Sequence, residues 1–324
     1  MIVRNISADV GKYNTKICVK RTGAEGIQRV CIRTKVDETN ANNNIFLGNT
    51  SLKVNFEGKE YLVGEAAETV SYETSKALNI HRVALYSAIA SGNLIDNGDV
   101  VNLTIGAPMS MYLNHKICKE FKNYIAPVDT IITITVNGVT KSFTFGKVIV
   151  LPESSGILFS DVKRFMGKTV AVVDIGGLNA NCSIFRNLSP VLSAVFTCNA
   201  GSNVMQEELQ KRLNVELSVQ IPNYMMDQIL LDGYIKKDLE KSAQIIHDYK
   251  LEHVCKLKNE CVAKGWDFDT INNLIFCGGT SLGLKKEILE VFPYTDESNF
   301  VPNAEFANAE GFLKFLLGQT SINR

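Results

Sequence analysis

Two short segments of the sequence combine an aspartate with a glycine-containing turn, and they resemble each other. The two segments, about 165 residues apart, are Asp9-Val10-Gly11-Lys12-Tyr13-Asn14-Thr15 and Asp174-Ile175-Gly176-Gly177-Leu178-Asn179-Ala180. Glycine allows a backbone to approach a ligand closely, and successive N–H groups in a turn can bind an anion. A carboxylate in each turn could hold a hydrated magnesium ion. Together the two segments predict a site for a metal-bound polyphosphate.

Apolar segments flank both turns and must position them. Residues 17–19 follow the first turn, residues 170–173 precede the second, and residues 182–185 follow it. A strand, a tight Asp-x-Gly turn and another strand predict a β-hairpin. The alternative is a hairpin whose aspartate and glycine serve the turn alone. The repetition favours function, and it predicts a fold of two related halves that face each other.

Two further segments contain residues suited to the same chemistry. Gly278-Gly279-Thr280-Ser281 lies between a predicted strand and a predicted helix, and a helix start favours phosphate or nucleoside groups. Its alternative is a simple cap, made by Thr280 or Ser281. Glu153 follows a strongly apolar strand and could orient or partly deprotonate an attacking water. The alternative for Glu153 is a favourable charge at a helix N-terminus.

Composition excludes several classes of protein. The chain has 324 residues, 45% of them hydrophobic and 21% charged, with zero net charge, which predicts a globular protein of two domains. The sequence has no long basic run, so direct gripping of nucleic acid is not supported. It has no apolar stretch long enough to span a membrane and no signal-peptide pattern at its start. We therefore expect a cytoplasmic protein.

Neither the cysteines nor the histidines predict a metal centre. The eight cysteines contain no CxxC pair, and we expect reduced, mostly buried thiols, as at Cys18, Cys182 and Cys277. His247, His253 and Cys255 form the one cluster with metal-ligand chemistry. Two of these are only two positions apart and would lie on different faces of a helix, so zinc is not expected.

Strands alternate with helices along the whole sequence, which predicts the α/β class. Residues 34–60 are polar, with asparagines clustered near 40–44, and suggest a surface loop or a small inserted lobe. Asn137-Gly138 predicts a hairpin, and residues 148–151 predict a separate strand. Helices are expected at 80–92, 110–124, 154–165, over most of 225–264, and at 306–318. On the helix that follows residue 203, Glu208 and Arg212 are four positions apart and suited to an ion pair.

Taken in order, these elements resemble the actin-like ATPase superfamily. Residues 9–16 resemble its first phosphate loop, residues 151–154 its first connecting element with the catalytic carboxylate, and residues 174–179 its second phosphate loop. Residues 278–281 resemble its adenosine motif, and residues 307–311 its second connecting element. The five elements span nearly the whole chain, and their order is more specific than any one of them.

Within this superfamily the sequence is most similar to the ParM/StbA group of bacterial plasmid-segregation filament proteins. The segments that carry this similarity are Tyr61-Leu62-Val63-Gly64-Glu65-Ala66, Pro152-Glu153-Ser154 and Gly201-Ser202-Asn203. The resemblance implies an actin-like, ribonuclease H-like duplicated fold with the nucleotide in the interdomain cleft. Domain I would comprise 1–166 and 305–324, with the inserted lobe at about 34–80. Domain II would comprise 167–304, with a helical lobe at about 205–265.

The resemblance also implies a role for each site residue. Asp9 and Asp174 would hold magnesium largely through water, and Glu153 would position the water that attacks the γ-phosphate. The phosphate-binding residues would be Gly11, Lys12, Tyr13, Asn14, Lys16, Gly176, Gly177, Leu178 and Asn179. The nucleoside-binding residues would be Gly201, Ser202, Asn203, Gly278, Gly279, Thr280 and Ser281.

The implied function is a nucleotide-driven filament. Mg-ATP, or Mg-GTP, would drive polymerisation, hydrolysis would later destabilise the filament, and a small DNA-binding adaptor on a centromere-like plasmid site would couple growth to DNA movement. No direct contact with DNA or membrane is expected. Lys12 and Tyr13 replace the small residues frequent in the first loop, and Asn179 and Ala180 replace threonines frequent in the second. The alternatives are a small-molecule kinase, a cell-shape or division scaffold, or a non-enzymatic binding protein of the same superfamily.

Overall fold

The structure is a computed structural model that describes residues 2–20, 26–39, 48–71, 73 and 75–322. The chain forms two compact units. The first, called unit 1 below, comprises Met1–Asp161 and Phe306–Arg324, and the second, unit 2, comprises Val162–Glu305. Each unit is built on its own sheet, with helices packed against it, and the predicted α/β class is confirmed.

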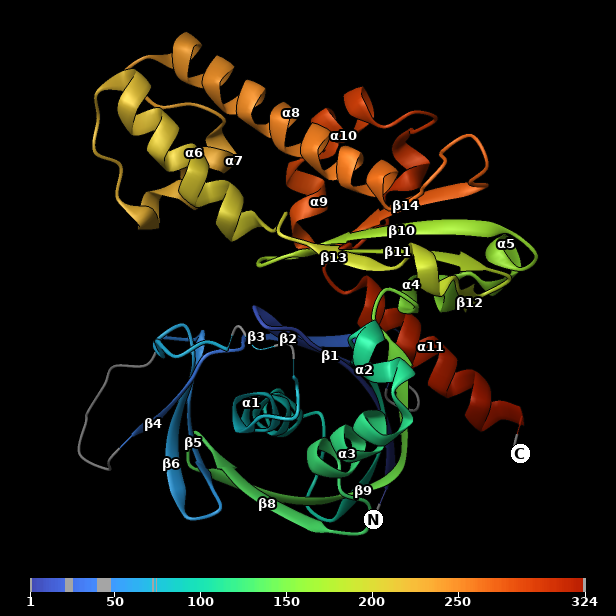
Figure 1. Cartoon of the computed structure of the whole chain (residues 1–324). Coiled ribbons are helices and arrows are strands. Elements are labelled where there is room, and N and C mark those ends of the chain that lie inside the picture. The colour runs from blue at the N-terminus through green and yellow to red at the C-terminus, as the bar shows by residue number, and fades with distance from the viewer. Residues whose placement is uncertain (1, 21–25, 40–47, 72, 74, 323–324) are drawn as a thin grey trace. The chain divides into compact units, whose positions relative to one another are not determined.

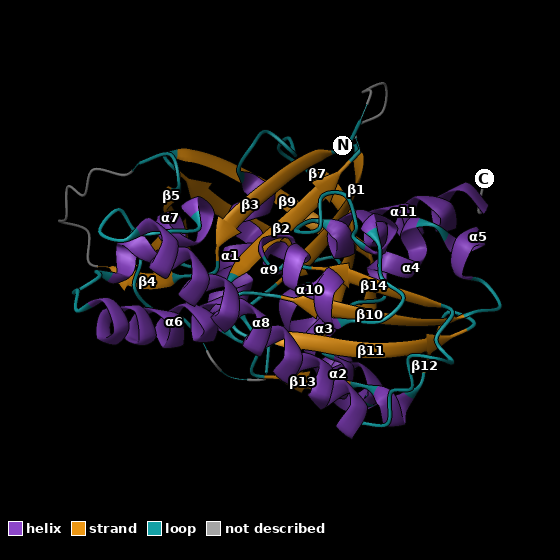
Figure 2. Cartoon of the chain, turned by 90° about the horizontal axis from the view of Figure 1, so that it is seen from above, coloured by secondary structure: helices purple, strands orange, loops and turns teal. Residues whose placement is uncertain are grey.

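Unit 1 contains a nine-stranded sheet in the order β3-β2-β1-β7-β9-β8-β5-β6-β4. Figure 2 shows the strands in orange and the helices in purple. The strands are β1 Val3–Val10, β2 Asn14–Val19, β3 Gln28–Arg33, β4 Val36–Thr39, β5 Ser51–Phe56, β6 Lys59–Gly64, β7 Asp99–Ala107, β8 Ile131–Val136 and β9 Val139–Pro152. The helices are α1 Asn79–Ala90, α2 Met109–Leu113, α3 His115–Ile125, α4 Gly156–Ser160 and α11 Ala307–Ile322.

The core of unit 1 forms where its sheet curves around α1 (Figure 1). Nine of the twelve residues of α1 are buried. Tyr86 on this helix lies edge-on to Phe56 and Phe143, with ring centroids 5.3 and 6.0 Å away. Edge-to-face aromatic pairs are stabilising beyond their buried area. The curved sheet and the enclosed helix therefore share one packed core that supports β1, β7 and β9.

Unit 2 contains a sheet in the order β12-β11-β10-β14, and β13 pairs with β11. Its strands are β10 Thr169–Ile175, β11 Ala180–Arg186, β12 Ser189–Pro190, β13 Phe196–Cys198 and β14 Asn273–Cys277. Its helices are α5 Val162–Phe165, α6 Ser202–Leu217, α7 Met226–Asp232, α8 Leu239–Ala263, α9 Gly279–Gly283 and α10 Lys285–Val291, with 3-10 turns at Leu192–Ala194, Asn223–Met225 and Glu297–Asn299. Helices α8 and α10 pack together on one face of the sheet (Figure 1).

The two predicted hairpins are confirmed, and they have the same topology. Strand β1 is antiparallel to β2 and parallel to β7. Strand β10 is likewise antiparallel to β11 and parallel to β14. In both units the aspartate-bearing strand is therefore flanked on both sides, and its C-terminal end is held in a fixed register.

Two expectations about strands are wrong. The segment 34–60, expected as a surface loop or inserted lobe, contains β4, β5 and the start of β6, all within the main sheet of unit 1. Its buried side chains alternate, as at Val54 and Phe56, so one face packs inward despite the polar composition. The asparagines at 40 and 42–44 lie outside the described residues. Residues 148–151, expected as a separate strand, belong to the long β9.

Two predicted helices are divided in the structure. The helix expected at 110–124 is two helices, because Asn114 is extended and its side chain accepts a hydrogen bond from the Ile117 N–H, which starts α3. The helix expected at 154–165 divides into α4 and α5 at Asp161, which is also non-helical. The segment 225–264, expected to be mostly helical, is mostly helical, as α7 and α8, with an interruption that begins at Gly233, which has a left-handed backbone.

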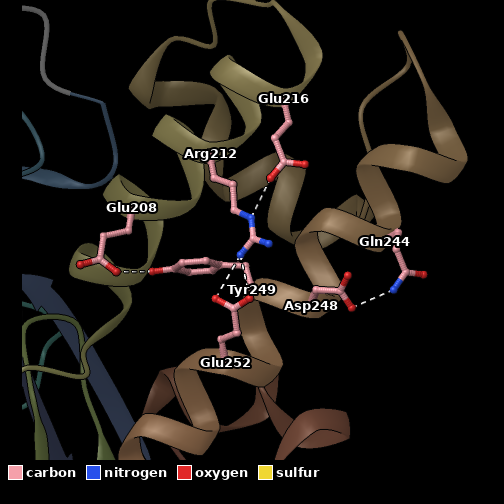
Figure 3. A network of polar contacts seen from close by, with 7 residues as sticks. All are labelled: Glu208, Arg212, Glu216, Gln244, Asp248, Tyr249 and Glu252. Carbon is pink, nitrogen blue, oxygen red and sulfur yellow. Dashed lines mark hydrogen bonds and ion pairs between the residues drawn. The ribbon is translucent and has the colours of Figure 1, made fainter.

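Helices α6 and α8 are joined by a polar network (Figure 3). Arg212 bonds to Glu216 at 2.9 Å on its own helix and to Glu252 of α8 at 2.9 Å. Glu208 instead accepts a hydrogen bond from the Tyr249 hydroxyl at 2.7 Å. The expected pairing of Glu208 with Arg212 is therefore wrong, because contacts with α8 take both side chains.

The cysteines, possible metal ligands and possible membrane helices complete the description of the fold. All eight cysteines are free thiols, of which Cys31 and Cys255 are exposed. Among the described residues, no group of three or more His, Cys, Asp or Glu side chains is placed to hold a metal ion. No helix within the described part of the chain combines the length and apolarity that a membrane crossing requires.

Candidate functional site

The first turn connects β1 and β2 at the edge of unit 1's core. Asp9 is partly buried between the buried Ala8 and Val10 and lies opposite Lys16 in the ladder. The Gly11 N–H donates to the Asn14 carbonyl at 2.9 Å, which closes the turn. A Cβ on Gly11 would lie 2.8 Å from that carbonyl oxygen, so the turn requires glycine.

The second turn connects β10 and β11 in unit 2 and has the same geometry. The Gly176 N–H donates to the Asn179 carbonyl at 2.9 Å. Asp174 occupies the place of Asp9, partly buried and two residues before the glycine, and it lies opposite Asn181 in the ladder. The sequence repeat is thus a repeat of hydrogen bonding. It presents one carboxylate and one closed turn in each unit.

Tyr13 of the first turn contacts the end of the neighbouring strand β3. The Arg33 guanidinium lies 3.2 Å from the centre of the Tyr13 ring, and Arg33 also pairs with Glu65 at 3.2 Å. The Tyr13 carbonyl accepts the Thr34 N–H at 2.9 Å. Cation–π stacking and this backbone bond fix the turn against the end of β3. The Tyr13 ring therefore helps to hold the turn in place, and the sequence did not predict the contact with Arg33.

Lys12 and Glu153 lie in one electrostatic environment in unit 1. Burial lowers the pKa of Lys12, the positive charge of Lys76 lowers it further, and the Glu153 carboxylate opposes both. The Glu153 N–H donates to the Ala107 carbonyl at 2.8 Å, which fixes Glu153 at the junction of β9 and β7. The first turn and the predicted catalytic carboxylate are therefore brought together. Sequence reasoning missed Lys76, which lies in an irregular segment without a motif.

In unit 2 the start of α6 packs directly on the second turn. The Ser202 N–H donates to the Gly176 carbonyl at 3.1 Å, and the Asn203 N–H donates to the Gly177 carbonyl at 2.8 Å. A Cβ on Gly201 would lie 2.3 Å from the Leu178 carbonyl carbon. The backbone N–H groups of Ser202 and Asn203 are thus used within the protein. Any contact with a nucleoside would have to come from their side chains.

The start of α9 packs on the same turn from the neighbouring strand. The Thr280 hydroxyl donates to the Gly176 carbonyl at 3.0 Å, and the buried Ser281 hydroxyl donates to the Gly278 carbonyl at 2.8 Å. Gly278 has φ +83° and is itself the N-cap of α9, without a side-chain cap. The alternative in which Thr280 or Ser281 caps this helix is therefore wrong. Gly279 is exposed and offers its backbone.

Gly278 also touches the predicted metal ligand of unit 2. A Cβ built on it would lie 2.5 Å from an Asp174 carboxylate oxygen and 2.3 Å from the Ile175 carbonyl oxygen. Any residue other than glycine at position 278 would therefore displace the Asp174 side chain. The predicted residues of unit 2 therefore converge on one place: the turn at 176–179, the start of α6 and the start of α9.

Comparisons with known proteins give consistent results. Residues 7–156 match the family described as "Actin like proteins N terminal domain". A structure of the Alp12 filament is similar to this chain, with 30% identity, a TM-score of 0.75, and coverage of 99% of this chain and 100% of Alp12. No match was found among curated proteins.

Two more distant structures are similar in fold. An archaeal actin homolog, Ta0583, in complex with ADP has 17% identity, a TM-score of 0.72 and 100% coverage of both chains. A 15-stranded ParM filament from Clostridium botulinum has 16% identity and a TM-score of 0.75, with coverage of 98% of this chain and 100% of that chain.

Proposed function

Because the chain belongs to the actin-like proteins, we propose that it is a nucleoside triphosphatase that assembles into filaments. Membership rests on the full-length similarity to Alp12 and on the family match over residues 7–156. It agrees with the actin-like fold class predicted from the motifs. The observation that carries the proposal is the repeated turn, with the Gly11 and Gly176 N–H groups bonded identically and a partly buried aspartate before each.

The form of these turns supports phosphate binding. Since the N–H groups of Gly11 and Gly176 already close the turns, the donors to phosphate come from the residues between each glycine and its partner. Lys16, opposite Asp9 on β2, adds positive charge to the first turn. Donors fixed before the reaction stabilise developing charge without reorganisation. We propose that one triphosphate uses both turns.

The carboxylates suit a magnesium ion that is also bound by water and phosphate better than a metal ion bound by protein ligands alone. Magnesium commonly binds through one or two carboxylates, with water and substrate phosphates as its other ligands. Asp9 in unit 1 and Asp174 in unit 2 are such carboxylates, and among the described residues no group of three or more His, Cys, Asp or Glu side chains could hold a metal ion. When bound, magnesium would neutralise phosphate charge and favour attack at phosphorus. Glu153 would orient the attacking water.

The nucleoside would bind where the second turn meets the starts of α6 and α9. We propose the exposed backbone of Gly279 and the side chains of Ser202 and Asn203 as its contacts. The hydroxyls of Thr280 and Ser281 would act indirectly, because both are bonded to the backbone. The ADP complex of the archaeal actin homolog supports an adenine nucleotide as the first ligand to test.

Filament formation would serve DNA movement through an adaptor. The Alp12 and ParM filaments support self-assembly of this chain. The zero net charge supports an indirect connection to DNA, through a small DNA-binding adaptor on a centromere-like plasmid site. In this proposal the protein provides the polymer, and the adaptor provides sequence recognition.

Light scattering and sedimentation test this function. The purified chain is mixed with Mg-ATP, Mg-GTP, Mg-ADP, or ATP with a chelator, and the pellet is examined by electron microscopy. We expect filaments with a magnesium triphosphate and none in the chelated sample. Failure to pellet with either triphosphate, together with phosphate transfer to a small acceptor, would replace the proposal with a kinase.

A further inference from the structure

A buried lysine contacts the proposed catalytic carboxylate. Lys76 lies in the irregular segment between β6 and α1, and it is 4% exposed. Its ammonium donates to the Glu153 Oε1, and the two side chains are 5% and 13% exposed. Burying an ammonium is costly unless it is paired, and a buried ion pair is weak evidence for stability. Because the pair is not evidence of stabilisation, its place beside Glu153 supports a role in the site.

The backbone around Glu153 fixes the direction of its side chain. Its N–H is bonded to the Ala107 carbonyl, and the next residue, Ser154, is fully buried with a left-handed φ of +67°. Strained backbone of this kind is concentrated at functional sites. A Cβ on Gly106 would lie 3.6 Å from the Glu153 Cγ, so the side chain passes close to β7. The carboxylate then ends at Lys76.

A second lysine makes the environment positive overall. Lys12 of the first turn is influenced by the charges of both Lys76 and Glu153. The ammonium groups of Lys12 and Lys76 and the Glu153 carboxylate therefore lie near the first turn, which itself carries Asp9 and, opposite it, Lys16. A net positive charge at this place suits a polyphosphate ligand.

We propose that Lys76 is a positioning residue that orients the Glu153 carboxylate toward the water attacking the γ-phosphate. This inference rests on the proposed function. The ammonium holds Oε1 and fixes the rotation of the carboxylate, while Lys76 itself does not bind the nucleotide. Loss of Lys76 would lower kcat and leave the KM for the triphosphate nearly unchanged, since the interaction acts only on the reacting water.

Steady-state hydrolysis of Mg-ATP by the full chain, measured as phosphate release, tests this role. We expect Lys76→Met to lower kcat at least about tenfold, with KM changed less than about threefold. Lys76→Arg, which keeps the charge, should recover most of kcat, whereas Lys76→Gln should not. Glu153→Ala should still assemble with nucleotide but release phosphate slowly. Lys59→Met is the matched control, because Lys59 pairs with Glu38 at 2.8 Å on the exposed surface of the same unit.

Chemical rescue separates orientation from a structural role. Ethylammonium added to Lys76→Ala should raise kcat in a saturable way, and ethanol of similar size should not. Circular dichroism tests whether each variant is folded. If Lys76→Met is not folded, Lys76→Gln serves as the uncharged variant.

The outcomes distinguish this inference from the proposed function. If the uncharged Lys76 variants keep the wild-type kcat while Glu153→Ala releases phosphate slowly, the role of Lys76 is overturned. The proposed function would still stand. A raised KM with unchanged kcat would instead assign Lys76 to phosphate binding. If the wild-type protein neither binds nor hydrolyses a triphosphate, the proposed function itself fails.

Discussion

A Cβ atom on Gly311 would lie 1.7 Å from the carbonyl oxygen of Gly156. The backbones of α11 and α4 are therefore in direct contact within unit 1. The approach is close on both sides, since a Cβ on Gly156 would lie 2.4 Å from the Asn308 carbonyl oxygen. This contact attaches the C-terminal helix to the segment that follows Glu153. Helix α11 begins with the predicted second connecting element, residues 307–311, and α4 directly follows the predicted first one, residues 151–154.

Gly311→Ala should destabilise unit 1 strongly, because neither backbone can move away without disturbing the core. We expect a loss of about 2–4 kcal/mol in the free energy of unfolding. Gly318→Ala on the same helix is the control, since no atom lies within 4 Å of its added Cβ. It should be neutral or slightly stabilising, because alanine is the better helix former. Urea unfolding followed by circular dichroism measures both, and equal stabilities would contradict the close contact.

Gly278→Ala should both destabilise unit 2 and weaken nucleotide binding. The backbone at φ +83° and ψ +151° lies in a region that essentially only glycine adopts and costs alanine about 1–3 kcal/mol, and the new methyl group would displace Asp174. Gly265→Ala isolates the first effect, because Gly265 has φ +80° with no atom within 4 Å of its added Cβ. Melting temperature and nucleotide titration should show a larger loss of stability for Gly278→Ala and a loss of affinity in that variant alone. Similar results for the two variants would show that Asp174 tolerates the methyl group.

Tyr249→Phe should cost about 1 kcal/mol of unfolding free energy, because it leaves the Glu208 carboxylate without its hydroxyl donor in the contact between α6 and α8 (Figure 3). Burial, together with the bond to Glu208, raises the pKa of the Tyr249 hydroxyl. Tyr294→Phe is the control, since its hydroxyl bonds Asp269 at 2.8 Å but the residue is 78% exposed. Its change should stay below about 0.5 kcal/mol. Chemical denaturation of both variants measures these changes. An unchanged free energy of unfolding in Tyr249→Phe would show that the network does not stabilise the helices.

Acid should weaken the fold through His81. Burial, and then the charge of Lys76, lowers the pKa of His81 from 6.5 to about 3. The unfolded chain takes up a proton below about pH 6.5, whereas the folded chain does not until about pH 3, so stability falls as the pH drops through this window. From pH 7 to pH 5 the loss from this group is about 2 kcal/mol.

Comparison of variants isolates this effect. The pH dependence of unfolding should be smaller in His81→Gln than in the wild-type protein. The same substitution at the exposed His115 is the control and should leave the dependence as it is. A wild-type slope retained in His81→Gln would assign the acid sensitivity to other groups.

Local chemistry in the sequence predicted the hairpins but not their surroundings. The turns at Gly11 and Gly176 are determined within a few residues, by glycine and the flanking apolar strands, so the pattern was sufficient. The pairing of Lys76 with Glu153 joins residues 77 positions apart and has no periodic signal. Arg33 on Tyr13 is missed for the same reason. Tertiary contacts of this kind become visible only when the sheet brings the segments together.

The breaks in the helices also could not be predicted from the hydrophobic pattern of the sequence. The apolar spacing across residues 110–124 continues through Asn114, yet its side chain starts a new helix there. Asparagine competes with the helical backbone for hydrogen bonds, and periodicity does not record that competition. In the same way Arg212 had a partner at the right spacing, but Glu252 from α8 lies within its reach.

Calorimetric titration with a magnesium-bound, non-hydrolysable ATP analogue tests the central claim most directly. The claim is that Asp9 and Asp174 serve one nucleotide. We expect one nucleotide per wild-type chain and at least about tenfold weaker binding in both Asp9→Asn and Asp174→Asn, with Asp248→Asn on the surface of α8 unchanged. Two nucleotides per chain, or wild-type affinity in either variant, would contradict the claim.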